Sequence, residues 1–135
     1  MLEHLHPKLV HFPIALVVAA MILDVVSYIV NKETLHLAAR YVFYLAAFFS
    51  VLTVFSGLVE ADKIHLNHPI LSAHRSYAIA LAASTCIFCV IFPFLPLRFK
   101  RPAFTFVVLV CVILVIMTGN YGGQMVYEYG IGVEH

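Results

Sequence analysis

Charge is scarce in this chain. Asp, Glu, Lys and Arg make up 11% of its 135 residues, whereas hydrophobic residues make up 63%. Soluble domains carry about 25% charged residues. Because so little charge cannot cover a globule in water, the composition excludes a soluble globular protein. It predicts a chain solvated by the lipid bilayer.

Several motifs with known chemistry are missing as well. The chain has no basic patch and no phosphate-binding glycine loop, so we predict no nucleic-acid partner. It has no H-E-x-x-H motif and no serine, histidine and acid arrangement, which argues against a self-contained enzyme. The three cysteines lie inside apolar runs, do not make a disulfide framework, and are interpreted as buried hydrophobes. No basic leader or small-residue cleavage site marks a signal peptide, so the first apolar stretch is expected to be retained.

Four apolar stretches reach the length of about 20 residues that a membrane-spanning helix needs. We predict helices over residues 7–30, 35–59, 69–92 and 102–127. Pro69 and Pro102 occupy the favoured first position of the third and fourth helices. Because the connections are short, the sequence predicts an all-α, up-down four-helix bundle that forms one transmembrane domain over residues 1–135.

The basic residues near the helix ends predict the orientation. Both termini and the second connection share one side with three of the eight basic residues. The other side carries five, namely Lys32, Arg40, Arg98, Lys100 and Arg101. This distribution places the five in the cytoplasm and both termini on the outer side of the membrane.

The eight histidines are distributed very unevenly. Seven fall on the predicted outer side, and only His36 lies on the other. The seven are His4, His6, His11, His65, His68, His74 and His135. Histidine is costly in lipid, so one inside a spanning helix is a functional candidate. His11 and His74 would lie roughly 6 and 7.5 Å into the first and third helices, at similar depth.

A haem group is one candidate for the space between these two histidines. The first and third helices should lie diagonally, with axes roughly 13 Å apart, so two inward imidazoles could bind one iron as axial ligands. Glycines would let the neighbouring helices approach the ring, at Gly57, Gly119, Gly122 and Gly123. Arg75 and Tyr127 lie at about the level where propionates would emerge, and Arg binds carboxylates well. These residues predict a b-type cytochrome that carries electrons.

Other interpretations remain open. His6 and His68, each followed by a proline at a helix start, are the runner-up ligand pair and could serve a second, shallower site. The same histidines could bind copper or zinc. In a non-catalytic structural subunit they would only hydrogen-bond neighbouring helices. A quinone site is conceivable, but no residue pattern indicates one.

Asp24 is an acid inside the first predicted helix. A buried acid could relay protons, but a pair with Arg40 or with a hydroxyl such as that of Ser27 is the simpler expectation.

Motifs along the whole chain resemble the domain of unknown function 2231 family. The resemblance rests on residues 6–16 (HPKLVHFPIAL), 56–60 (SGLVE), 73–74 (AH) and 122–133 (GGQMVYEYGIGV). The family's closing motif commonly has a histidine where this chain has Tyr129, so either Tyr129 lies outside the site or this member differs.

The resemblance implies a small bacterial four-helix protein of the inner membrane. Some family members are joined to, or encoded beside, c-type cytochrome modules. By analogy this implies an electron-transfer role, with a periplasmic c-type cytochrome or other redox-complex subunits as partners.

Overall fold

A computed structural model describes residues 5–64 and 68–131. His4, His65 and His135 lie outside these residues. The regular structure in the described part is entirely helical. Its elements are α1 (Leu5–Leu9), α2 (His11–Ile29), α3 (Glu33–Ile64), α4 (Pro69–Ile91), a short 3-10 helix η1 (Phe92–Phe94) and α5 (Leu97–Tyr127).

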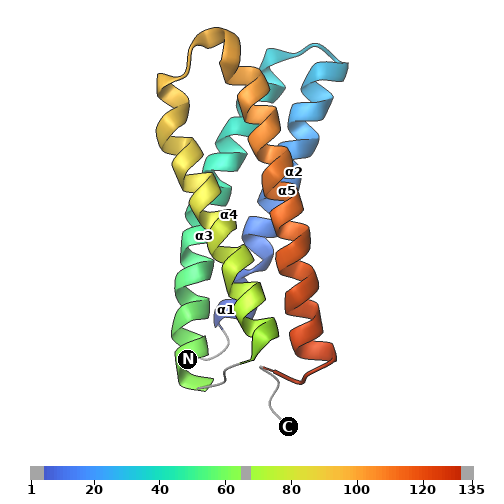
Figure 1. The fold of residues 1–135 in the computed structure, drawn as a ribbon. Helices are drawn as coiled ribbons and strands as arrows, with labels where there is room; N and C mark the ends of the chain where they lie inside the picture. The colour runs from blue at the N-terminus through green and yellow to red at the C-terminus, as the bar shows by residue number, and fades with distance from the viewer. Residues whose placement is uncertain (1–4, 65–67, 132–135) are drawn as a thin grey trace.

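Four helical segments of the described chain are long and apolar enough to cross a membrane, which confirms the predicted fold class. They run over His6–Ile29, Glu33–Asp62, Pro69–Phe94 and Leu97–Tyr127. Figure 1 shows them side by side, with alternating direction along the chain. α2 and α4 each pack against α3 and α5, so α2 and α4 lie diagonally in the ring.

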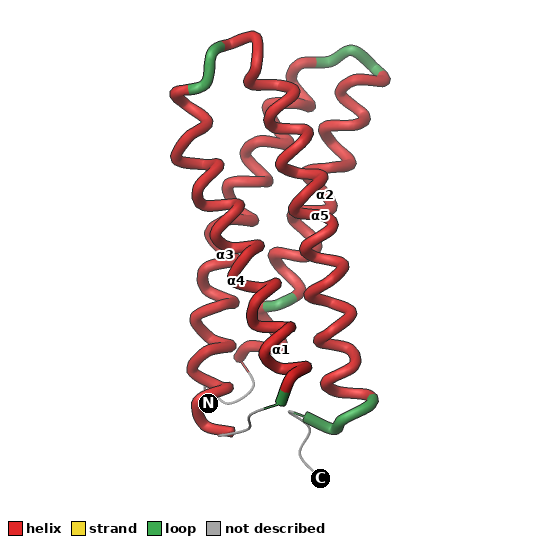
Figure 2. Tube along the Cα trace, viewed as in Figure 1, coloured by secondary structure: helices red, strands yellow, loops and turns green. Residues whose placement is uncertain are grey.

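The two ends of the bundle differ in the segments that they hold. α1, the end of α3, the start of α4 and the end of α5 lie together, and we call this the terminal end (Figure 2). The α2–α3 turn and the α4–α5 connection lie at the other end, which we call the basic end because it holds Lys32, Arg40, Arg98, Lys100 and Arg101.

The first predicted helix is divided near its start. α1 ends at Leu9 and α2 begins at His11, within the predicted range 7–30. The cause is Pro13, which has no N–H to donate to the carbonyl of Leu9. The hydroxyl of Thr53 on α3 donates to that carbonyl instead, at 3.3 Å. The carbonyl that Pro13 leaves free thus ties the end of α1 to Thr53 on α3.

Two helices extend beyond their predicted ranges. α3 covers Glu33–Ile64 rather than 35–59, and α5 begins at Leu97 rather than at Pro102. Pro96 is extended (ψ 142°) and precedes the first turn of α5, while Pro102 lies inside the helix. Between α2 and α3, Asn31 takes the left-handed conformation (φ 51°) that commonly ends a helix.

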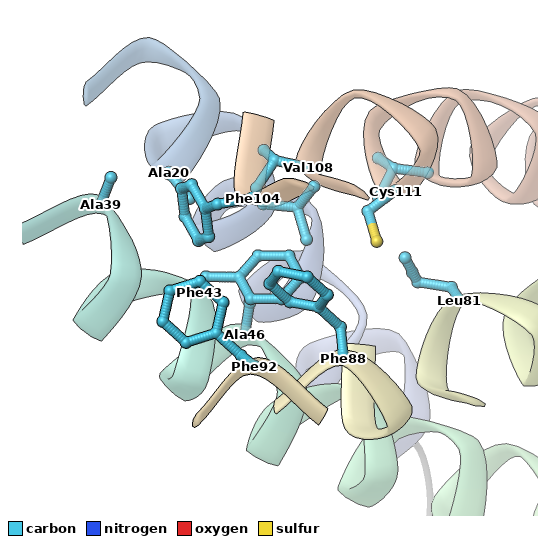
Figure 3. Packing of buried hydrophobic residues seen from close by; sticks show 12 residues of the cluster. Ala20, Ala39, Phe43, Ala46, Leu81, Phe88, Phe92, Phe104, Val108 and Cys111 are labelled. Atoms are coloured by element: carbon cyan, nitrogen blue, oxygen red, sulfur yellow. The ribbon is translucent and has the colours of Figure 1, made fainter. Parts of the chain in front are cut away.

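The core between the two ends is filled by aromatic rings. Phe43, Phe88, Phe92 and Phe104 pack edge to face or tilted, with neighbouring ring centres 5.3–6.4 Å apart (Figure 3). Aromatic pairs at such spacing stabilise beyond the area that they bury. This dry layer separates the polar groups of the terminal end from those of the basic end.

Candidate functional site: a histidine pair at the terminal end

Two histidine rings meet inside the terminal end. His6 on α1 and His74 on α4 lie with ring centres 6.3 Å apart and ring planes at 87°. Both side chains are partly buried. They come from diagonal corners of the bundle, as the sequence predicted for a ligand pair, but the first member is His6.

The structure thus differs from the expected pairing of His11 with His74. His11 is exposed, although it contributes to the wall of a cavity beside His74. His6 lies on α1 and His11 begins α2, on the other side of the break after Leu9, and it is the ring of His6 that lies beside that of His74.

Each of the two rings is held by a carbonyl of the neighbouring helix. Nδ1 of His6 is 3.0 Å from the carbonyl oxygen of Thr53 and 3.3 Å from Oγ of Ser56. Nδ1 of His74 is 3.0 Å from the carbonyl oxygen of Thr118. Because a carbonyl only accepts, Nδ1 carries the proton in both rings and Nε2 keeps its lone pair. Within residues 5–64 and 68–131, neither Nε2 has a hydrogen-bond partner.

Two glycines make room for the rings. A Cβ at Gly57 would lie 2.7 Å from Cε1 of His6, and one at Gly122 would lie 3.2 Å from Cε1 of His74. Each glycine is four positions after the threonine whose carbonyl holds the same ring. The two supports therefore share the pattern T-x-x-x-G, over residues 53–57 and 118–122.

Apolar cavities flank the pair. The larger, of about 380 Å³, reaches toward the core and has His6, His74, Gly119, Gly122 and Gly123 in its wall. The smaller, of about 140 Å³, has the same two histidines in its wall, together with Arg75 and Glu60. Both histidines thus contribute to the walls of two spaces that are otherwise lined mainly by apolar residues.

The remaining predicted site residues lie around this centre or away from it. A Cβ at Gly119 or Gly123 would meet no atom within 4 Å, so these glycines leave open space. Arg75 is exposed at the smaller cavity. Tyr127 is 89% exposed and contributes to neither cavity wall, so the structure does not bring it to the site.

The runner-up pair of His6 with His68 is also separated. His68 is the N-cap of α4, where its Nδ1 accepts from the N–H of Ile70 at 3.2 Å. Its ring lies 4.7 Å from that of Tyr129, centre to centre. Tyr129 therefore packs outside the cavities, against a histidine that caps a helix.

A zinc site needs more protein ligands than the pair supplies. Zinc sites use four ligands, or three with an open position. Among the residues that the structure describes, no group of three or more His, Cys, Asp or Glu side chains could hold a metal ion.

Haem requires only two axial ligands from the protein, and the pair fits this requirement. The residues that would hold the iron are His6 and His74, because their ring centres lie 6.3 Å apart and each Nδ1 is held by a carbonyl, which leaves Nε2 as the ligand atom. Ligand histidines commonly donate their other N–H to a carbonyl, as both do here.

The glycines provide a direct test of the geometry. In Gly57→Ala, the new methyl group would lie 2.7 Å from Cε1 of His6, so the ring must shift against the carbonyl of Thr53 that holds it. We expect a changed ¹⁵N signal for His6 and a loss of about 1–3 kcal/mol in the free energy of unfolding. NMR and denaturant unfolding in micelles measure both quantities.

Gly119→Ala is the matched control for this variant, because nothing lies within 4 Å of its Cβ. It should leave the ring signals unchanged and gain about 0.5–1 kcal/mol from helix propensity. Equal effects of the two substitutions would contradict the packing of His6 on Gly57.

Comparison with known proteins places the whole chain in one family. No curated protein and no solved structure matches the chain. Residues 3–135 match the model of the family described as "Predicted membrane protein (DUF2231)". The family agrees with the four apolar helices and was indicated by the motifs at both ends of the chain. The chain is therefore a multi-pass membrane protein that belongs to the DUF2231 family.

Proposed function

We propose that this protein binds haem b between His6 and His74 and acts as a b-type cytochrome-like electron carrier. The observation that carries the proposal is the pair itself, with ring centres 6.3 Å apart. Each Nδ1–H is held by a carbonyl, so each Nε2 lone pair remains available for iron. The ligand pair of the proposal is accordingly His6 with His74, in place of His11 with His74.

The surroundings support haem over other ligands. The two cavities offer apolar space on both sides of the pair, and glycines let the helices approach. Arg75 at the smaller cavity suits a propionate. Haem iron with axial imidazoles supplies one-electron redox chemistry, and the protein positions and tunes it.

The location of the site bears on the partners. The basic end carries five of the eight basic residues, which favours the cytoplasmic side of the bacterial inner membrane. The histidine pair would then lie near the outer face. A periplasmic c-type cytochrome, or another subunit of a redox complex, could exchange electrons with it there.

An optical spectrum of the purified protein tests this function. Expressed with sufficient haem and reduced with dithionite, the protein should show the sharp α and β bands of a low-spin haem with one haem per chain. A colourless, fully folded protein would refute the proposal. Metal analysis would then separate a copper or zinc site, which needs a third ligand, from a structural subunit without a cofactor.

A further inference from the structure

A second polar cluster lies at the basic end, on the far side of the aromatic core. Asp24 on α2 is completely buried, and His36 on α3 is nearly so, with 3% of its surface exposed. Nδ1 of His36 donates to Oδ1 of Asp24 at 2.7 Å, and the hydroxyl of Thr105 on α5 donates to Oδ2 at 2.6 Å. The expected partners of Asp24, Arg40 and Ser27, do not bond this carboxylate.

One arginine of the basic end bonds other groups than this carboxylate. Arg101 on α5 donates to Oε2 of Glu33 on α3 and to Oγ of Ser27, both at 3.0 Å. Ser27 in turn donates to the backbone carbonyl of Asp24 at 2.6 Å. Arg101 is thus linked to the main chain of Asp24 through Ser27, while the positive charge of Arg101 is paired with Glu33.

Two further cations of this end lie over the ring of Phe92. The guanidinium of Arg40, one turn after His36 on α3, lies 4.5 Å from the ring centre of Phe92 in η1. The amine of Lys100 on α5 lies 5.4 Å from the same ring. The ring of His36 packs edge-on against Phe104, at 5.2 Å between centres. When the imidazole is neutral, the pair of Asp24 and His36 carries one negative charge inside the bundle.

Two hydroxyl groups connect this buried carboxylate to the outside of the bundle near the end of α2. The phenol oxygen of Tyr28, a residue that is 49% exposed, lies 3.2 Å from Oγ1 of Thr105. Thr105 has a second acceptor in the carbonyl of Arg101, also at 3.2 Å. The Thr105 hydroxyl can therefore donate to Asp24 when the acid is ionised, and to that carbonyl when Asp24 carries a proton.

We propose that Asp24 and His36 form an intramembrane proton-binding site that exchanges protons with the basic end through Thr105 and Tyr28. On uptake, Thr105 gives its hydroxyl proton to Oδ2 of Asp24 as it receives the phenolic proton of Tyr28. Tyr28 recovers a proton from water, so one proton moves from water to the pair. The charge of the pair changes from minus one to zero. Because the two groups are coupled, the added proton is assigned to the pair of Asp24 and His36 and not to either residue alone.

Neutralisation is the driving force for this uptake. An unbalanced charge inside a membrane protein is expensive, and acids buried there commonly serve proton relays. Because the aromatic core lies between this cluster and the histidine pair, the inference holds with or without haem at the terminal end.

Infrared difference spectroscopy tests the proposal on an intact bundle. The chain has only two aspartates, and Asp62 is exposed at the terminal end. In Asp62→Asn labelled with ¹³C-aspartate, every labelled side-chain carboxyl signal comes from Asp24; ¹⁵N-histidine labels the partner. Between about pH 4 and about pH 10 we expect one pH-dependent change in the protonation of this pair. If both groups keep one protonation state throughout, the cluster is a static ion pair and the proposal is wrong.

Two threonine variants test whether protons move through Thr105 and Tyr28. Thr105→Val removes the connecting hydroxyl and should slow proton uptake after a pH jump by about tenfold or more. Thr85→Val removes a buried hydroxyl that donates within α4 to the carbonyl of Ala82 and should leave the rate unchanged. Equal rates in both variants would overturn the route through Thr105 and Tyr28.

Discussion

His6→Ala and His74→Ala are each expected to abolish the low-spin haem spectrum, whereas His11→Ala retains it. Each of the first two substitutions removes one imidazole of a pair whose ring centres lie 6.3 Å apart. Substitution of groups that merely support a metal ligand costs about 10–100-fold in affinity, so removal of a ligand should cost at least that much. The haem-to-protein ratio and the reduced α band measure the result.

His11→Ala is the control because this histidine is exposed and its removal leaves both supporting carbonyls in place. Circular dichroism verifies that all three variants keep their helices. If His11→Ala loses the spectrum and His6→Ala keeps it, the ligand pair is the one predicted from the sequence, and the His6 assignment fails.

His36→Ala should destabilise the bundle more than any other histidine substitution. It removes the donor to Oδ1 of Asp24 and leaves the completely buried carboxylate with the hydroxyl of Thr105 as its remaining side-chain donor. Breaking a buried pair by removal of one member costs about 3–5 kcal/mol. Denaturant unfolding in mixed micelles, followed by circular dichroism, gives the difference in the free energy of unfolding.

A double variant separates the loss of the pair from the loss of packing. In Asp24→Asn, His36→Ala no charge remains to be left unpaired, so the loss should be smaller than the sum of the two single losses. His68→Ala removes a helix N-cap and should cost only about 1 kcal/mol. Additive losses in the double variant would show that Asp24 and His36 do not interact.

The sequence predicted the number, type and order of the spanning helices because the apolar runs are long and the polar connections short. It missed the break after Leu9, although Pro13 was its visible cause. The break is completed by a tertiary contact, the hydroxyl of Thr53 on the carbonyl of Leu9, and such a contact cannot be read from a local pattern. α5 begins at Leu97, so the prediction that Pro102 is the first residue of this helix was wrong.

The candidate site was predicted in part. His74, Gly57 and Gly122 lie at its centre, but depth alone favoured His11 over His6. Depth is read from residue counting, whereas the direction of a side chain depends on how α1 is rotated. The T-x-x-x-G pattern, which occurs once in α3 and once in α5, was a sequence signal for the site. Each copy supports one histidine ring. The partnership of Asp24 with His36 was missed because it joins α2 to α3 across a turn.

The carbonyls and glycines that hold the two histidine rings also determine when the site can form during biosynthesis. His6 receives its carbonyl from α3, so the first helical hairpin holds everything that positions one ring. His74 receives its carbonyl from Thr118 and its glycine from Gly122, both on the last helix to leave the ribosome. Neither half of the chain alone brings two imidazoles together. Any cofactor that needs both rings must therefore be loaded after the final helix has inserted, which makes loading a checkpoint for complete insertion.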